Sequence, residues 1–365
     1  MKELGLEILN RIYEYGYDAY IVGGFVRDEL LGIETNDIDI TTNATPMELK
    51  NIFPNIEMKS SSYGSVKIIY DNTSFDITTF REEENYFDNR HPGSINYVND
   101  LKSDLIRRDF TINTLCIDKD GNLIDLLNAK DDLNNHILKT VGDSNISFSR
   151  DALRILRAIR FASYLDFSLS DEIVEAIEKN KYLLKRLSYD RRKQELDKIF
   201  GSNRAREGIE LIKRFHLEDV LELNNINRVH DYSDIVGIWS MINPTAYKFS
   251  SNEKELIKKI NLVYEMDNLD NYVLYKYGLY VNVIAGINKG IDKKDILEKY
   301  DSLIIKKKDD IEISAKEICD ILKKRPGSFI GEIFHDLEMK ILNNELPNEK
   351  NKIIEYIQRM EVYDE

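Results

Sequence analysis

The chain has few cysteines, few histidines and no long apolar stretch. Its 365 residues include two cysteines, Cys116 and Cys319, and five histidines. These numbers do not support a disulfide framework or a zinc site of closely spaced ligands, and we expect a reducing, cytoplasmic setting. No apolar run is long enough to cross a membrane as a helix, and the amphipathic first segment carries charges throughout. We therefore expect neither a membrane span nor a secretory signal.

Acidic residues outnumber basic ones, 65 to 51, which gives a formal net charge of −14. Such an excess disfavours a nucleic-acid partner, because phosphate binding relies on lysine and arginine. Local charge matters more than the mean, however. Basic residues gather in the segments 106–108, 150–160 and 185–193. These segments keep a nucleic-acid partner open.

Strand and helix patterns alternate in the first part of the chain, and helical patterns alone follow. The predicted elements of the first part are a helix over 1–18, a buried strand over 19–24, a helix over 25–32, a hairpin of 66–70 and 75–80, and a long polar loop over 81–98. From about residue 146 onward, apolar residues recur with the spacing of amphipathic helices. A chain of this length holds more than one core, and the first domain boundary is expected near 140–150.

The segment NDIDITT alternates carboxylates with isoleucines. On a strand, Ile38 and Ile40 would face a core while Asp37 and Asp39 share the other face, where their repulsion favours a bound cation such as Mg²⁺. An ordinary half-buried edge strand is the alternative. Asp76, in FDITTF, would add a third carboxylate from a neighbouring strand, which suits two-metal nucleotidyl transfer. Without a metal it is simply an outward polar residue.

Two glycines, Gly23 and Gly24, separate the predicted strand from the helix that follows. Such a turn lets a phosphate approach the backbone, and the amides of a helix start bind anions, although a Gly-Gly pair alone is more often a plain turn. Arg27 lies in the first turn of that helix. An arginine there opposes the helix dipole unless an anion is near, which favours a phosphate site.

Two further segments are rich in arginine. RRDFTINT places Arg107 and Arg108 before Asp109 and Asn113, and these side chains either order a site, meet phosphate, or form a solvated charge pair. RDALRILRAIR repeats arginine at 150, 154, 157 and 160, on one arc of a helix whose opposite arc is apolar. Asp151 is close to one turn from Arg154, so their side chains can meet. An amphipathic helix with a salt-bridged solvent face is the alternative.

Taken together, GGFVRDELLG, NDIDITTNATP, RRDFTINT and DALRILRAIRFA closely resemble the class II tRNA nucleotidyltransferase family, which includes bacterial CCA-adding enzymes and poly(A) polymerases. Residues 316–350 also resemble the family's C-terminal segment. The resemblance implies an α+β chain: a DNA-polymerase-β-like nucleotidyltransferase head with a small mixed sheet over 1–143, then an all-helical neck over 144–203, body over 204–268 and tail over 269–365. It implies addition of C, C and A to the 3′ end of tRNA from CTP and ATP.

The resemblance also implies roles for single residues. Asp37 and Asp39 match the metal-binding pair for Mg²⁺, and Asp76 stands where the family commonly has glutamate. We expect the nucleotide to be bound by Gly23, Gly24, Arg27, Arg108, Asp109, Asn113, Asp151, Arg154, Arg157 and Arg160. The family's Glu-Asp-x-x-Arg motif begins here with Arg150, and its later Glu-Arg pair reads Asp190-Arg191. Asp151 and Arg154 would serve as an amino-acid template for the incoming base.

Other activities fit the same motifs. A poly(A) polymerase usually ends in a basic segment, whereas this chain ends in EYIQRMEVYDE. A CC-adding enzyme lacks a loop that the segment 81–98 retains, while an enzyme that adds only A stays open. A non-catalytic RNA-binding module would be expected to have lost a metal carboxylate. The acceptor arm of tRNA, CTP and ATP are the expected partners, with no membrane and no required protein.

Overall fold

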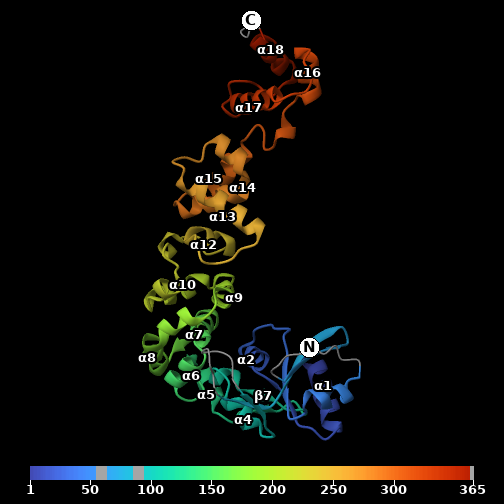
Figure 1. Ribbon diagram of the computed structural model, residues 1–365, viewed down its shortest axis with the longest axis vertical. Coiled ribbons are helices and arrows are strands. Elements are labelled where there is room, and N and C mark those ends of the chain that lie inside the picture. The colour runs from blue at the N-terminus through green and yellow to red at the C-terminus, as the bar shows by residue number, and fades with distance from the viewer. Residues whose placement is uncertain (55–63, 85–93, 362–365) are drawn as a thin grey trace. The chain divides into compact units, whose positions relative to one another are not determined.

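The computed structural model describes residues 1–54, 64–84 and 94–361. Its residues form two compact units, Met1–Glu222 and Leu223–Glu365 (Figure 1). The first unit combines a sheet with helices and the second is helical, so the α+β class and the change from mixed to helical structure are confirmed. The finer division at residues 143, 203 and 268 stays a prediction.

A six-stranded sheet in the order β3-β4-β2-β1-β7-β8 forms the centre of the first unit. Only β2 and β4 run parallel to each other; the other neighbours are antiparallel. Its strands are β1 (Ala19–Val22), β2 (Asp39–Thr42), β3 (Ser65–Tyr70), β4 (Thr73–Thr79), β7 (Cys116–Ile117) and β8 (Leu123–Ile124). The predicted strand at 19–24 and the hairpin of β3 and β4 are thus confirmed.

Alternation along β2 sets which face of the sheet is buried. Ile38 and Ile40 are buried, while Asp37 and Asp39 are exposed. The helix α1 (Lys2–Glu14) packs on the apolar face with Ile8 and Ile12 fully buried, as its amphipathic pattern requires. The carboxylates therefore lie on the face away from α1, and α2 (Gly24–Leu31) follows β1 directly.

The polar segment 81–98 is not the long loop that its sequence predicts. Its ends form strands β5 (Arg81–Glu84) and β6 (Ser94–Tyr97), which pair antiparallel, and the residues between them lie outside the described ones. Glu83 binds the guanidinium groups of Arg81 and Arg107, at 2.7 and 3.2 Å. These strands are stabilised by ion pairs and lack the alternation of apolar and polar residues by which a strand is predicted. The prediction of a long loop was wrong for this reason.

The remaining helices of the first unit follow the predicted amphipathic pattern from α6 onward, with one interruption, whereas that pattern did not predict α4 and α5. They are α3 (Pro46–Ile52), α4 (Leu101–Ile106), α5 (Ala129–Asn134), α6 (Ser144–Arg150), α7 (Leu153–Leu165), α8 (Asp171–Asn180), α9 (Tyr189–Phe200), α10 (Ala205–Arg214) and α11 (Leu217–Leu221), with 3₁₀ turns Thr111–Asn113 and Lys181–Arg186. The single helix predicted over 150–160 is wrong, because Asp151 is extended and its Oδ1 accepts from Leu153 N. A short parallel pair, β9 (Ile137–Leu138) and β10 (Ser168–Leu169), was not predicted.

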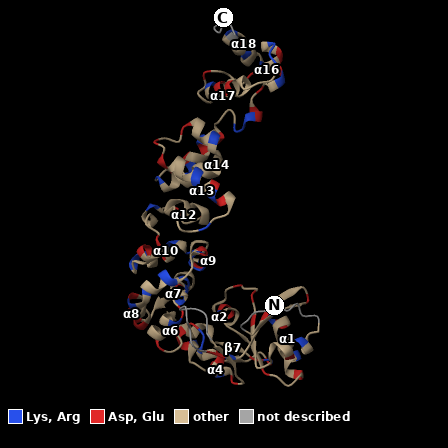
Figure 2. Cartoon of the chain, viewed as in Figure 1, with Lys and Arg blue, Asp and Glu red and all other residues tan. Residues whose placement is uncertain are grey.

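The second unit is built from helices alone within its described residues. Its helices are α12 (Ile235–Ile242), α13 (Ser251–Glu265), α14 (Asn271–Asn288), α15 (Lys293–Asp301), α16 (Ala315–Leu322), α17 (Phe329–Leu342) and α18 (Lys350–Glu361), with 3₁₀ turns Ile226–Arg228 and Lys308–Asp310. Gly278, with φ of 75°, interrupts α14. Figure 2 shows acidic and basic side chains interspersed along these helices. Among the described helices, none has both the length and the apolar character to cross a membrane.

Candidate active site

Three aspartates lie at one end of the parallel strand pair. Asp39 on β2 stands opposite Asp76 on β4, and Asp37 comes two residues before Asp39. Asp39 keeps exposed surface, but the protein around its carboxylate partly removes it from water. This desolvation and repulsion from Asp37 raise the pKa of Asp39 to about 6, against the attraction of Arg108. The carboxylate of Asp39 is thus in surroundings that favour a nearby positive charge.

Asp76 already has a cation beside it. Its Oδ2 lies 3.4 Å from Lys67 Nζ on β3, and both side chains are partly exposed. Across the described parts of the chain, no three Asp, Glu, His or Cys side chains are grouped closely enough to hold a metal ion. An ion bound by Asp37 and Asp39 would therefore need further oxygen ligands from substrate or water.

Gly23 lies where β1 turns into α2, close to Asp39. Its φ of 83° and ψ of −132° belong to a region that glycine adopts readily. A Cβ atom at this position would lie 3.6 Å from Arg108 Nη1 and 3.9 Å from Asp39 Oδ2. The turn at Gly23 thus brings the backbone close to a carboxylate and a guanidinium, and the amides of Gly24 and the following residues begin the helix beside it.

Arg108 has donor capacity left over. Its Nη2 binds Asp104 Oδ2 at 3.1 Å, and Arg107 binds the other oxygen of the same buried carboxylate. The Nε atom of Arg108 is buried and has no hydrogen-bond partner among the residues that the structure describes. Because a buried unpaired donor is costly, this atom is suited to an anionic ligand.

Arg27 is buried and points toward the neighbouring 3₁₀ turn. Its Nε donates to Asp28 Oδ1 at 2.8 Å and its Nη1 to Asn113 Oδ1 at 2.6 Å. The Nδ2 of Asn113 in turn donates to Asp109 Oδ1 at 3.0 Å. Asn113 therefore connects α2 to the RRDFTINT segment.

Asp109 completes this chain of contacts with α7. Its Oδ2 accepts from Arg157 Nε at 2.7 Å, and its Oδ1 accepts from the amide of Phe110. Burial acts to raise the pKa of Asp109, but the guanidinium groups of Arg157 and Arg154 outweigh it and hold the pKa well below its usual range. The carboxylate is thus fixed in its charged form between two helices.

The arginines of the 150–160 segment take up different positions. Arg150 ends α6 and is exposed. Arg154 Nη2 donates to Arg107 O at 2.8 Å and its Nη1 to Ser147 Oγ, while its Nε lies 4.0 Å from Asp151 Oδ2. Arg160 Nε lies 3.0 Å from Glu195 Oε2 on α9. The arc of four arginines predicted from spacing is thus reduced to three on α7.

Phe161 joins three of the predicted arginines. The guanidinium carbons of Arg27, Arg157 and Arg160 lie 4.9, 5.7 and 4.4 Å from the centre of its ring. Guanidinium groups are attracted to the faces of aromatic rings, and this attraction offsets part of the repulsion that Arg157 and Arg27 exert on Arg160. Sequence reasoning missed Phe161 and Glu195. Both follow the arginine motif at helical positions, but nothing in the pattern marks them as partners of arginine.

Three family models match successive parts of the chain. The poly A polymerase head domain matches residues 19–139, the RNA and SrmB-binding site of polymerase A matches 166–225, and domain 2 of tRNA nucleotidyltransferase matches 245–357. The first covers the sheet with its aspartates and the RRDFTINT segment. The third lies wholly within the second unit.

Similar proteins span nearly the whole chain. A CCA-adding enzyme of Lactococcus lactis is 33% identical, over 97% of this chain and 95% of its own length. A CCA-adding enzyme of Oceanobacillus iheyensis is 31% identical, over 96% and 95%. Among solved structures, that of the Bacillus stearothermophilus CCA-adding enzyme in complex with CTP has a TM-score of 0.83 and 26% identity, covering 99% of this chain and 98% of that one.

Proposed function

Because this chain belongs to the family of CCA-adding enzymes, we propose that it adds C, C and A to the 3′ end of tRNA, taking them from CTP and ATP without a nucleic-acid template. The observation that carries the proposal is that the aspartates of β2 and β4 lie close to Arg108 and to the glycine turn. Asp39 Oδ2 and Arg108 Nη1 both lie within 4 Å of the point where a Cβ atom on Gly23 would stand, so the glycine turn, a carboxylate and a guanidinium are close together. A carboxylate and a phosphate-binding group in that arrangement suit nucleotidyl transfer.

We propose that Asp37 and Asp39 hold Mg²⁺. The raised pKa of Asp39 supports this fit, because it reflects first the partial removal of this carboxylate from water and then repulsion from Asp37, both of which a bound cation would offset. Hard oxygen ligands of this kind are those that Mg²⁺ prefers, with the remaining positions taken by water and phosphate. When bound, the metal lowers the pKa of the attacking hydroxyl and neutralises charge on the leaving group. Asp76 would stand beside this pair from the adjacent strand.

The triphosphate would be bound beside the aspartates, at Arg108 and the glycine turn. Arg108 offers its unpaired Nε, and the start of α2 offers the amides that follow Gly23 and Gly24. Arg27, Asp109 and Asn113 are held in contact with one another rather than left free. Their part in this proposal is to orient Arg157 and to support the glycine turn.

Asp151 and Arg154 would select the base. Cytosine and adenine each present an amino donor beside a ring-nitrogen acceptor, whereas uracil and guanine present the reverse. A carboxylate only accepts and a guanidinium only donates, so the pair matches C and A alike. The contacts of Arg154 with the backbone of Arg107 and with Ser147 hold its guanidinium beside Asp151. Arg157 and Arg160, further along α7, would lie toward the phosphates.

A direct assay tests the proposal. Purified protein with Mg²⁺ receives tRNA lacking all three terminal nucleotides, tRNA lacking the last two, and tRNA lacking only the final A, each with one labelled nucleotide. We expect C on the first two, A on the third, and neither U nor G on any. Incorporation of A alone would assign the chain to the A-adding enzymes, and long A tails to the poly(A) polymerases. No incorporation at all would reject the activity. The reaction belongs in the cytoplasm, where these substrates occur.

A further inference from the structure

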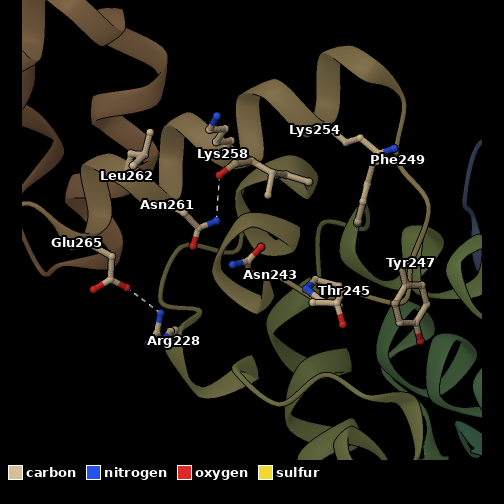
Figure 3. A pocket seen from close by; sticks show the side chains of 12 residues that line it. Arg228, Asn243, Thr245, Tyr247, Phe249, Lys254, Lys258, Asn261, Leu262 and Glu265 are labelled. Atoms are coloured by element: carbon tan, nitrogen blue, oxygen red, sulfur yellow. Dashed lines mark hydrogen bonds and ion pairs between the residues drawn. The ribbon is translucent and has the colours of Figure 1, made fainter.

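The second unit contains a cavity of about 530 Å³ between α13 and the segment that follows α12 (Figure 3). Phe249 and Tyr247 form one wall, and α13 supplies the other. The ring of Trp239 packs against both aromatic residues, with ring centres 5.1 Å from Tyr247 and 5.5 Å from Phe249. Trp239 therefore supports the aromatic wall from the side away from the cavity. The volume of the cavity is in the range of small-ligand sites.

Two asparagines provide polar groups in the cavity. The Nδ2 of Asn261 donates one hydrogen bond to Ser240 O and one to Ile257 O, at 2.9 Å each. Its Oδ1 accepts from no group in the described parts of the chain and is the atom that a ligand can use. Asn243 ends α12 in the left-handed conformation, with φ of 46°, and its side chain also lines the cavity (Figure 3). A ligand with both donors and acceptors on its edge would be complementary to these amides.

The rim of the cavity carries a net positive charge, because two lysines line it besides the ion pair of Arg228 with Glu265. Lys254 and Lys258 lie one turn apart on α13, both exposed, and neither forms an ion pair with any described residue. Their neighbour Lys259 differs, since it binds Glu255. On a chain with a net charge of −14, two unpaired lysines beside an aromatic wall point to an anionic ligand that carries a flat ring.

We propose that this cavity receives a single unstacked nucleotide from a loop of the RNA substrate. The base would lie against Phe249 with its edge toward Asn243 and Asn261, and the phosphates on either side would meet Lys254 and Lys258. Proteins read RNA in this manner at loops, where bases can turn outward, and bind the backbone with exposed lysines. A paired stem cannot place a base in such a cavity. The inference rests on the proposed action on tRNA and adds a second contact, separate from the 3′ end.

A charge reversal tests the rim. The variant K254E/K258E is compared with K293E/K294E, which changes the net charge equally at the exposed start of α15, where carboxylates suit the helix dipole. We expect the Kd for tRNA lacking its final A to rise about tenfold in the first variant and less than about twofold in the second. In the first variant, the slope of log Kd against log salt should also decrease by about one to two, because about one or two phosphate contacts are lost. If both variants lose tRNA affinity equally, the change in net charge alone explains the loss, and the inference is overturned.

A second RNA separates a loop contact from a stem contact. Binding is repeated with an acceptor-stem duplex of two annealed strands, which has no loop. The tenfold loss should disappear with the duplex, and a loss that persists would place the lysines on the stem and overturn the inference. N243G keeps the left-handed backbone while removing the amide, and we expect it to weaken tRNA binding about threefold without affecting the duplex. Unchanged tRNA binding in both K254E/K258E and N243G would also overturn it.

The two proposals fail separately. Incorporation of C and A by the unaltered chain decides the proposed activity, whatever the variants bind. If the chain adds C and A while K254E/K258E binds tRNA like the unaltered protein, the loop-nucleotide site alone is rejected.

Discussion

Arg157 on α7 holds Asp109, a residue 48 positions earlier in the chain, through its Nε at 2.7 Å from Oδ2. The carboxylate is 10% exposed and the arginine side chain 34% exposed, so the ion pair lies at the edge of the core rather than in open solvent. Together with the contacts of Arg154 with the backbone of Arg107 and of Phe161 with Arg27, it joins α7 to the residues around the glycine turn.

Neutralising Asp109 should lower stability. Asp109→Asn keeps the size of the side chain but leaves Arg157 without its counter-ion, and we expect a loss of about 2 kcal/mol in the free energy of unfolding by urea. This figure is below the range for fully buried pairs because Arg157 is partly solvated. Glu34→Gln, at an exposed loop position, is the control and should stay within about 0.5 kcal/mol of the unaltered protein. An Asp109→Asn protein as stable as this control would show that the ion pair contributes nothing.

The same pair predicts a pH dependence of stability. The folded-state pKa of Asp109 is held below its usual range, so its contribution is complete above the unfolded-state value of about 4 and is lost as the pH falls toward the folded-state value. The free energy of unfolding should therefore decrease below about pH 4, and less steeply in Asp109→Asn. Parallel pH profiles of the two proteins would contradict this assignment.

Removing Asp39 should abolish nucleotide addition. Asp39→Ala takes away one of two carboxylates proposed for Mg²⁺, and we expect kcat to fall by at least about a thousandfold, with the Kd for tRNA within about twofold of normal. Lys67→Ala is a useful comparison, since it frees the neighbouring Asp76 from its cation without altering the pair. Near-normal turnover by Asp39→Ala at ordinary Mg²⁺ would reject the metal assignment.

The choice of base should depend on Asp151 and Arg154. Replacing either with alanine removes one half of the donor and acceptor pattern, so discrimination of C over U should fall, from a ratio on the order of 10⁴ for a well-built polar site. Arg157→Ala should instead raise KM for all nucleotides alike. The measurement is kcat/KM for the four nucleotides on tRNA awaiting C. If the Asp151 and Arg154 variants lose activity yet keep the normal ratio of C to U, these residues support structure only.

Binding of tRNA should weaken steeply with salt. Exposed basic residues between α16 and α17 (Lys323, Lys324 and Arg325) are candidates for phosphate contacts, as are the exposed Lys185 and Arg186 of the segment 185–193. Arg192 of that segment is buried against backbone carbonyls. Each contact contributes a slope of about −0.9 to log K against log salt on a duplex. A triple alanine variant at 323–325 should reduce that slope by up to about three. Affinity that does not change between low and high salt would exclude this mode of binding.

Local patterns predicted the two faces of the strand with Asp37 and Asp39 well, although β2 is an inner strand of the sheet and not the edge strand of the alternative interpretation, and they failed where distant residues decide the structure. The alternation from Asp37 to Ile40 is a property of one strand, and the structure places these side chains on opposite faces as expected. The break at Asp151 was hidden because the arginine spacing is helical, although the Asp151 side chain binds the backbone two residues ahead. No spacing rule reveals that Asn113 joins Arg27 to Asp109, since these contacts depend on side-chain packing between separate segments.

The contacts of Asp109 bear on how the protein can be cut into parts. A fragment that stopped before α7 would retain the sheet, the glycine turn and all three aspartates, yet it would leave a carboxylate in apolar surroundings with its counter-charge removed. Such a fragment has to take up a proton or admit water at that point, and either change disturbs Asn113 and, through it, Arg27. The boundary at which the sequence turns from mixed to helical is therefore a poor place to end an expression clone. A cut after Glu222, where the first compact unit ends, keeps both partners of the ion pair on the same polypeptide.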